Sequence, residues 1–234
     1  MKRTDIERLN TAIAQREPMA LVTWLGSGEQ KLFHHPNTRD MSEELELSLT
    51  LSDAFNKDRS IIATIDGDDV FIKVYNPALR MIIIGAVHIA QALIPMARQL
   101  GYEAIVIDPR TAFASEERFA GVRRDTRWPD EALADIGVDT RTAFVALTHD
   151  PKIDDPALTV ALNASPFYIG ALGGRRTNEK RVERLTAAGI SAEKIAGIHA
   201  PVGLDIGAMG APEIAVSIIA QVTAALRGKL KPKT

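Results

Sequence analysis

Residues 80–110 read RMIIIGAVHIAQALIPMARQLGYEAIVIDPR and decide the fold class. A short apolar run ends at Gly85, a helical pattern follows, and a second apolar run ends at Asp108. This order predicts a strand, a tight turn, a helix and a second, parallel strand with an acid at its end. Asp108 lies 23 positions after Gly85, close to the roughly 20 expected for a carboxylate that binds the ribose of a dinucleotide.

The region after residue 80 keeps the same alternation of apolar runs and helical stretches. The runs cover residues 81–84, 103–107, 142–147 and 166–169. Uninterrupted apolar runs are typical of parallel strands that helices cover on both faces. A final helix is predicted over 211–227, because a proline and a glutamate suit its first turn and an apolar stripe follows. The fold class is therefore α/β, with a Rossmann-like parallel sheet.

The first 75 residues follow a different pattern. We predict an amphipathic helix over 4–16, a strand over 19–25 and a hairpin over 61–75 that turns at Asp66-Gly67. Residues 26–60 are polar and are predicted to be irregular.

Asn76-Pro77 breaks the strand pattern and marks the predicted domain boundary. We expect a small α+β N-terminal domain over residues 1–76, which is short and free of cysteine, and a Rossmann-like domain over residues 77–234.

Composition excludes several classes of protein and site. The chain of 234 residues has a net charge of −2, which does not fit a nucleic-acid-binding protein. It contains no cysteine, so disulfides, thiolate metal sites and a cysteine nucleophile are excluded. No apolar run approaches 18 residues, and the charged N-terminus lacks the apolar core of a signal peptide. We expect a cytoplasmic protein that contacts no membrane.

The first candidate ligand contacts lie at the carboxyl ends of the first two strands of this fold. In the turn GAVHIA, Val87 stands where a dinucleotide fingerprint has a second glycine, so its side chain narrows the space for a diphosphate. His88 is either a phosphate or pterin contact or an exposed residue at the start of a helix. Asp108 suits a ribose diol and Arg110 a phosphate, with a loop-capping role for the acid as the alternative.

Three later segments carry further candidates. In THDPK, His149 follows a strand and is the best candidate for acid–base or ligand contact, whereas a capping role is expected for Asp154 or Asp155. In GALGGRRTNEKR, a glycine-rich loop that includes Gly173 precedes Arg175 and Arg176, a pattern that suits an anionic group.

The same helix also permits a solvated basic face, which we assign to Lys180 and Arg184. In HAPVGLDIGAMG, Asp205 is flanked by apolar residues and is expected to be partly buried and paired. Convergence of His88, His149 and His199 on a metal is an alternative, but the chain offers no short-range ligand pair, and our expectation is that no metal is bound.

Five motifs occur in order along the chain: GAVHIAQAL, IDPR, THDPKIDDPAL, FYIGALGGRRTNEKR and HAPVGLDIGA followed by PEIAVSIIAQ. Together they resemble the C-terminal Rossmann-like domain of the XdhC/CoxI family, the xanthine dehydrogenase accessory proteins. The resemblance covers about residues 75–227.

The resemblance implies a cytoplasmic accessory protein, or chaperone, for maturation of molybdenum hydroxylases of the xanthine or CO dehydrogenase type. Such a protein binds the molybdenum cofactor, as molybdopterin or its dinucleotide, for sulfuration by a cysteine desulfurase and insertion into the apo-enzyme. It implies no catalytic role for any residue. The cofactor-binding candidates are Gly85, Val87, His88, Asp108, Arg110, His149, Gly173, Arg175, Arg176 and Asp205.

The chain departs from the family pattern at several points. Family members often have glycine at the place of Val87, and they usually carry an N-terminal domain with cysteine-rich motifs that residues 1–75 lack. We expect either a homodimer or a separate subunit that supplies the missing cysteine-rich part, and another protein as the sulfur donor. An NAD(P)-dependent oxidoreductase that uses His149, and a nucleotide-sensing regulatory module, are the alternative functions.

Overall fold

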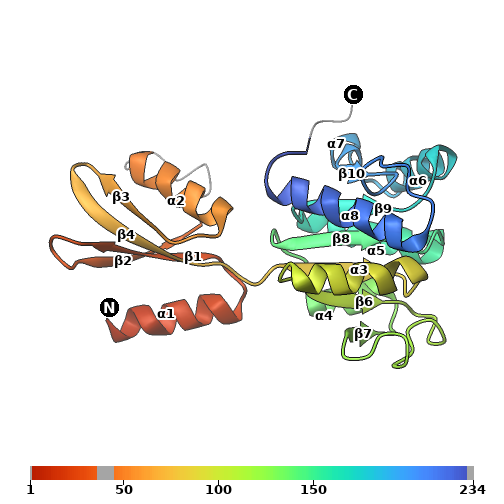
Figure 1. The fold of residues 1–234 in the computed structure, drawn as a ribbon, viewed down its shortest axis with the longest axis horizontal. Coiled ribbons are helices and arrows are strands. Elements are labelled where there is room, and N and C mark those ends of the chain that lie inside the picture. Colours follow the sequence, from red (N-terminus) through yellow and green to blue (C-terminus); the bar gives the residue numbers. More distant parts are fainter. Residues whose placement is uncertain (1, 36–44, 231–234) are drawn as a thin grey trace. The chain divides into compact units, whose positions relative to one another are not determined.

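The computed structural model describes residues 2–35 and 45–230. The chain forms two compact units, residues 1–77 and residues 78–234 (Figure 1). Within the described residues, no helix combines the length and the apolar character that a membrane crossing requires.

In its described residues, the N-terminal unit consists of a four-stranded antiparallel sheet and two helices. Its strands lie in the order β2-β1-β4-β3. The predicted hairpin at 61–75 is confirmed, and Asp66 and Gly67 have φ angles of 50° and 86°. The elements are α1 (Arg3–Ala14), β1 (Met19–Trp24), β2 (Gln30–His34), α2 (Leu45–Lys57), β3 (Ile61–Ile65) and β4 (Asp68–Tyr75).

The prediction that residues 26–60 are irregular was wrong for the part that the structure describes, whereas residues 36–44 lie outside the described residues. This stretch contains strand β2 and helix α2. Helix α2 buries Leu47, Leu51, Ala54 and Phe55 in a cluster with Val22 and other residues of the sheet. Those side chains recur at helical spacing, and their burial against the sheet stabilises α2 although polar residues lie between them.

The second unit contains a parallel sheet of six strands in the order β10-β9-β8-β5-β6-β7. When β5 is numbered 1, this is the strand order 3-2-1-4-5-6 of dinucleotide-binding folds. The chain first adds β6 and β7 on one side of β5 and then adds β8, β9 and β10 on the other side, so the switch point of the topology lies between β5 and β8. The elements are β5 (Arg80–Ile84), α3 (His88–Gln99), β6 (Glu103–Ile107), β7 (Arg123–Asp125), α4 (Pro129–Ile136), β8 (Thr142–Ala146), α5 (Pro151–Ala164), β9 (Tyr168–Ala171), α6 (Arg175–Ala187), α7 (Ala192–Ala196), β10 (Ile198–His199) and α8 (Ala211–Leu226).

Helices cover both faces of this sheet, which confirms the predicted fold class (Figure 1). Met81 and Ile83 of β5 belong to the cluster under α3 and α8, whereas Ile82 and Ile84 belong to the cluster under α4 and α5. Successive residues of a strand point to opposite faces. The uninterrupted apolar run of β5 therefore supplies both cores.

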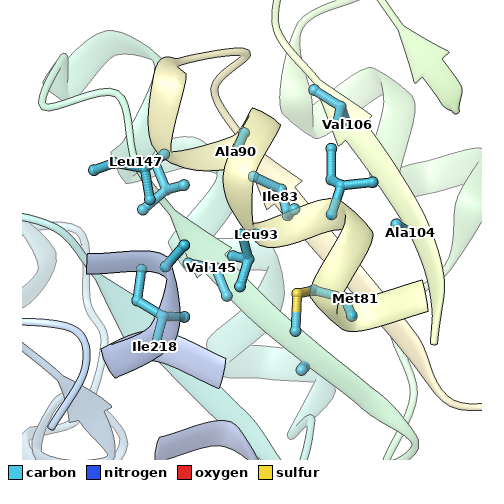
Figure 2. Packing of buried hydrophobic residues seen from close by; sticks show 14 of the residues in the cluster. Met81, Ile83, Ala90, Leu93, Ala104, Val106, Val145, Leu147 and Ile218 are labelled. Carbon is cyan, nitrogen blue, oxygen red and sulfur yellow. The ribbon is translucent and has the colours of Figure 1, made fainter. Parts of the chain in front are cut away.

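The layer of α3 and α8 brings distant parts of the unit together. Leu93 of α3, Val145 of β8 and Ile218 of α8 are fully buried in one cluster (Figure 2). The predicted final helix is confirmed as α8, with a proline and Glu213 in its first turn. Pro95 lies inside α3 and is exposed, and it removes one backbone N–H donor from the helix.

Candidate functional site

The turn after β5 contacts the turn after β8 at the point where the strand order changes direction. Gly85 has a φ of 109°, and a Cβ at this position would lie 2.7 Å from Cγ2 of Thr148. Both the positive φ and the lack of space require glycine here. The structure therefore places Gly85 next to Thr148, and so close to the segment of His149, at the carboxyl edge of the sheet.

The carboxylate of Asp108 is fully buried, and both of its oxygens accept hydrogen bonds. Its Oδ2 accepts hydrogen bonds from the Ala86 N–H at 2.8 Å and from Nη2 of Arg110 at 2.8 Å. Its Oδ1 accepts from the backbone N–H and from Nε of Arg110, at 3.0 and 2.9 Å. Burial alone would raise the pKa of Asp108, but the hydrogen bonds from Arg110 and Ala86 outweigh it and hold that pKa below its usual range.

Arg110 is the exposed part of this pair. Its side chain is 33% exposed, against 0% for Asp108, and its guanidinium lies 4.4 Å from the centroid of the Phe113 ring. A contact from Asp108 to a ribose diol would require Arg110 to leave, because both carboxylate oxygens are occupied. That contact stays a prediction, and Arg110 is the group of the pair that a ligand meets first.

Val87 and His88 lie at the start of α3. Val87 is the residue before the first turn, is half-buried and packs against the core cluster of α3 and α8. Its side chain gives α3 no cap, and His88 is exposed. Free N–H groups at a helix start attract anions.

The turn between β8 and α5 is organised by Asp154. Oδ1 of Asp154 accepts a hydrogen bond from the Thr148 hydroxyl at 2.7 Å, and Oδ2 accepts from the backbone N–H of His149 at 3.1 Å. Burial raises the pKa of Asp154, which is 2% exposed. His149 itself has a φ of 63° and an exposed side chain, a backbone conformation that is uncommon for residues other than glycine.

The capping role expected for Asp154 or Asp155 was wrong. Asp150 is the cap of α5, and its side chain accepts from the Lys152 N–H at 3.0 Å. Asp155 instead forms an ion pair with Arg184 of α6, in which Nη2 and Oδ1 lie 3.1 Å apart. Arg184 is consequently half-buried, so its assignment to a solvated face was also wrong. Lys180 is exposed, as expected.

A pocket of about 200 Å³ opens between this turn and helix α6. Its charged lining is mainly cationic, with Asp154 as the carboxylate. The lining residues are His149, Pro151, Asp154, Arg176, Thr177, Lys180, Arg181 and Arg184.

The two arginines at the start of α6 differ in their surroundings. Arg176 lines the pocket, whereas Arg175 does not, and the Arg175 side chain is 94% exposed beside Glu179. Gly173 precedes them with a φ of 133°, and a Cβ there would lie 2.8 Å from Cγ2 of Thr177. The predicted loop therefore delivers Arg176, rather than both arginines, to the pocket.

Sequence reasoning did not single out Arg181. This side chain is 2% exposed, lines the pocket and donates through Nη2 to the Leu172 carbonyl at 2.7 Å. A signal was present, because the pocket residues of α6 recur at one helical face. Those residues are Arg176, Thr177, Lys180, Arg181 and Arg184.

The segment around Asp205 does not match its expected environment. Asp205 is exposed, so the prediction of partial burial was wrong. The ring of His199 stacks on Tyr168 with centroids 5.1 Å apart. Gln221 of α8 fixes the segment, because its Oε1 accepts from the Tyr168 hydroxyl at 2.6 Å and from the Gly203 N–H at 2.8 Å. Across residues 2–35 and 45–230, no three His, Asp or Glu side chains form a group that could hold a metal ion.

A sequence model of the XdhC Rossmann domain matches residues 81–222. The chain belongs to the XdhC family. The resemblance seen in the five sequence motifs is thereby confirmed, and the matched segment contains every candidate cofactor-binding residue named above.

Among curated proteins, this XdhC-family chain is 34% identical over 148 residues to the "Molybdenum cofactor insertion chaperone PaoD" of Escherichia coli (strain K12). It is 30% identical over 155 residues to a protein of Bacillus subtilis (strain 168) that is named as a probable xanthine dehydrogenase subunit. The matches cover 63% and 66% of this chain, but 40% and 45% of those relatives. The matched part of the chain thus spans less than half the length of each relative.

The fold of the XdhC-family chain also resembles a solved structure. A crystal structure of a xanthine dehydrogenase from Bacillus halodurans matches 99% of this chain and 66% of that chain, with a TM-score of 0.63 and 21% identity. At this identity the likeness concerns the fold alone.

Proposed function

We propose that this protein is an accessory protein, or chaperone, for the maturation of molybdenum hydroxylases of the xanthine or CO dehydrogenase type. Its Rossmann unit would bind the molybdenum cofactor, as molybdopterin or its dinucleotide, and hand it to the apo-enzyme. Membership of the XdhC family and the 34% identity to a protein named as a cofactor insertion chaperone support this role.

The observation that carries the proposal is the cationic carboxyl edge of the parallel sheet. Arg110 from the turn after β6, and Arg176 and Lys180 from α6, carry positive charge at the edge where such folds bind ligands. The pKa of Arg110 is raised first by its hydrogen bond to Asp108, and also by the more distant charges of Asp150 and Asp154. The charged side chains of the turns after β6 and β8 therefore interact with each other. A phosphate-bearing pterin suits the arginine and lysine side chains around these turns.

The residues have different roles in this proposal. Gly85 lets the turn after β5 lie against Thr148, Asp108 holds Arg110 in place, and Val87 limits the depth to which a ligand enters. His149 and Arg176 contact the cofactor. The proposal assigns binding and transfer of the cofactor, without a turnover reaction, to this chain.

Sulfuration of the cofactor needs a partner. A persulfide requires a cysteine, and the chain has none. A cysteine desulfurase would therefore act directly on cofactor held by this protein, or a separate subunit would provide the cysteine-rich part.

The test is anaerobic binding of molybdopterin dinucleotide to the purified protein, followed by gel filtration. We expect the cofactor to elute with the wild-type protein and with Arg175→Ala, and to be lost from Arg176→Ala. Arg175 is the matched control, because it neighbours Arg176 and does not line the pocket. Retention no greater than that on serum albumin would refute the proposal.

The dinucleotide-type strand order also supports an NAD(P)-dependent oxidoreductase, in which His149 would transfer the proton. Titration with NAD(P)H, followed by its own fluorescence, separates the two functions. A saturable signal together with no binding of molybdopterin would favour the oxidoreductase. Saturable binding of free nucleotide, with no reaction and no carrier partner, would favour a nucleotide-sensing module.

A further inference from the structure

The pocket between the β8–α5 turn and helix α6 has an unbalanced charge. Arg184 is neutralised by its ion pair with Asp155. Arg176, Lys180 and Arg181 remain, and the pocket opposes them with the carboxylate of Asp154. The interior of this pocket is therefore cationic.

Arg181 is the decisive group, because it is a buried cation with spare donors. Within residues 2–35 and 45–230, it forms no ion pair within 4.0 Å, and its buried Nε has no hydrogen-bond partner. Burial lowers the pKa of Arg181, and the more distant charges of Asp154 and Asp155 only partly oppose this. A buried guanidinium without a paired anion is unfavourable, and an anion bound in the pocket would relieve that.

Asp154 does not take the place of that anion. Its two oxygens accept hydrogen bonds from the Thr148 hydroxyl and the His149 N–H, which hold the turn in shape. Its charge is also opposed by burial, because its pKa is raised. Arg181 itself donates through Nη2 to the Leu172 carbonyl and through Nη1 to Oδ1 of Asn178 at 3.5 Å, which leaves one N–H of each terminal nitrogen for a ligand in the pocket.

The size of the pocket limits what it holds. About 200 Å³ corresponds to roughly six or seven water molecules, and it lies below the roughly 300 Å³ at which pockets begin to enclose a whole small-molecule ligand. A phosphate or diphosphate group fits this volume, whereas a complete pterin dinucleotide does not. Planar guanidinium groups match phosphate oxygens in geometry as well as in charge.

We propose that this pocket is a phosphate subsite, in which Arg181 binds a phosphate or diphosphate group at the base while Arg176 and Lys180 bind it at the rim. The inference rests on the proposed function only for the identity of the ligand that carries the phosphate. The remainder of that ligand would lie outside the pocket, along the carboxyl edge of the sheet.

The test uses the full chain and inorganic pyrophosphate, with binding measured by calorimetry at low ionic strength. We expect saturable binding at one site, at least a tenfold loss of affinity in the double variant Arg176→Ala/Lys180→Ala, and less than a twofold change in Arg175→Ala. Arg181→Lys keeps the charge but lacks the planar fork, and we expect at least a fivefold loss there. If Arg181→Lys fails to fold, the rim variant decides, because its two residues lie at the mouth of the pocket rather than in the core.

A second arm separates the two proposals by comparing molybdopterin dinucleotide with a free nucleoside diphosphate. If pyrophosphate and the nucleotide bind, and the rim variant weakens both while the molybdenum cofactor does not bind, the subsite stands and the proposed function fails. If the cofactor binds wild type and rim variant equally, the proposed function stands and the subsite is wrong. Absence of saturable pyrophosphate binding to the wild type also overturns the subsite.

Discussion

Asp108 and Ala86 join the ends of two neighbouring strands, because the Asp108 carboxylate accepts a hydrogen bond from the Ala86 N–H at 2.8 Å. Ala86 belongs to the turn after β5, and Asp108 directly follows β6. Arg110 completes the arrangement by donating to both carboxylate oxygens. The acid that a dinucleotide fold would offer to a ribose therefore stabilises the turn and orients an arginine.

Replacement of Asp108 by asparagine should destabilise the protein by about 3 kcal/mol at pH 7, because it breaks a buried, hydrogen-bonded ion pair. The folded-state pKa of Asp108 is lowered, so its stabilisation is present above the unfolded value and is lost as the pH falls from about 4 toward the lowered value. Urea unfolding of wild type and variant between pH 7 and pH 3 measures this. The difference between them should shrink at the acid end.

Asp125 provides the matched control for that measurement. Its side chain pairs with Arg127 in the same i, i+2 arrangement at the end of the neighbouring strand, but Arg127 is exposed and Asp125 is only partly buried. We expect Asp125→Asn to cost less than about 1 kcal/mol. Equal losses at the two positions would show that burial and the bond to Ala86 do not matter.

Gly85→Ala should lower the stability of the Rossmann unit by more than the cost of placing an alanine at a positive φ. The new methyl group would meet Cγ2 of Thr148 at 2.7 Å, and the φ of 109° is unfavourable for alanine. Gly101→Ala is the control, because Gly101 has a φ of 83° and no heavy atom within 4 Å of the place that a Cβ would take, so we expect about 1 kcal/mol there.

Thr148→Ser removes the methyl group that Gly85→Ala would strike and keeps the hydroxyl that donates to Asp154. The double variant should therefore recover part of the stability lost in Gly85→Ala. Thermal unfolding of the four proteins gives the coupling energy, which we expect to be about 1 kcal/mol and favourable. Strict additivity would mean that the two turns do not contact each other.

Tyr168→Phe should destabilise the protein by about 1 to 2 kcal/mol, because it removes a buried hydroxyl that donates to Gln221 at 2.6 Å. Tyr102→Phe is the natural comparison, since the buried Tyr102 hydroxyl has no hydrogen-bond partner among the described residues. Its loss should be neutral or stabilising. Denaturant midpoints of the two variants should therefore move in different directions, or at least by clearly different amounts.

The fragment of residues 78–234 should fold without the N-terminal unit. Its two hydrophobic clusters consist entirely of residues from 79 onward. We expect cooperative thermal unfolding and the same pyrophosphate affinity as the full chain. A fragment that is soluble but lacks dispersed amide signals in its NMR spectrum would show that the boundary at 77–78 is misplaced.

The parallel sheet was predictable from sequence because strands that are buried on both faces consist of uninterrupted apolar runs, as β5, β6 and β8 do. Helix α2 was missed because its stripe lies among serines, threonines and acids, so only its contact with the sheet reveals it. Short strand β2 pairs with β1 but buries little of its own surface.

The candidate site was predictable in place but not in detail. The carboxyl edge and the segments around His149 and Arg176 follow from strand order. The burial of Arg181 depends on the Leu172 carbonyl that receives its hydrogen bond, and Asp108 is covered by an arginine that sequence reasoning had assigned to a ligand. Such pairings arise from tertiary geometry, which residue type and spacing do not encode.

The shared layer of α3 and α8 determines when one face of the parallel sheet becomes fully covered during synthesis of the chain. Leu93 and Ile218 lie in one cluster although 125 positions separate them in sequence, so the part of the strand face that α8 covers stays exposed until that helix leaves the ribosome. At about 5–20 residues per second, that interval lasts roughly 6 to 25 s. A nascent chain of this protein therefore exposes apolar strand surface for that whole interval, although α3 is already in place.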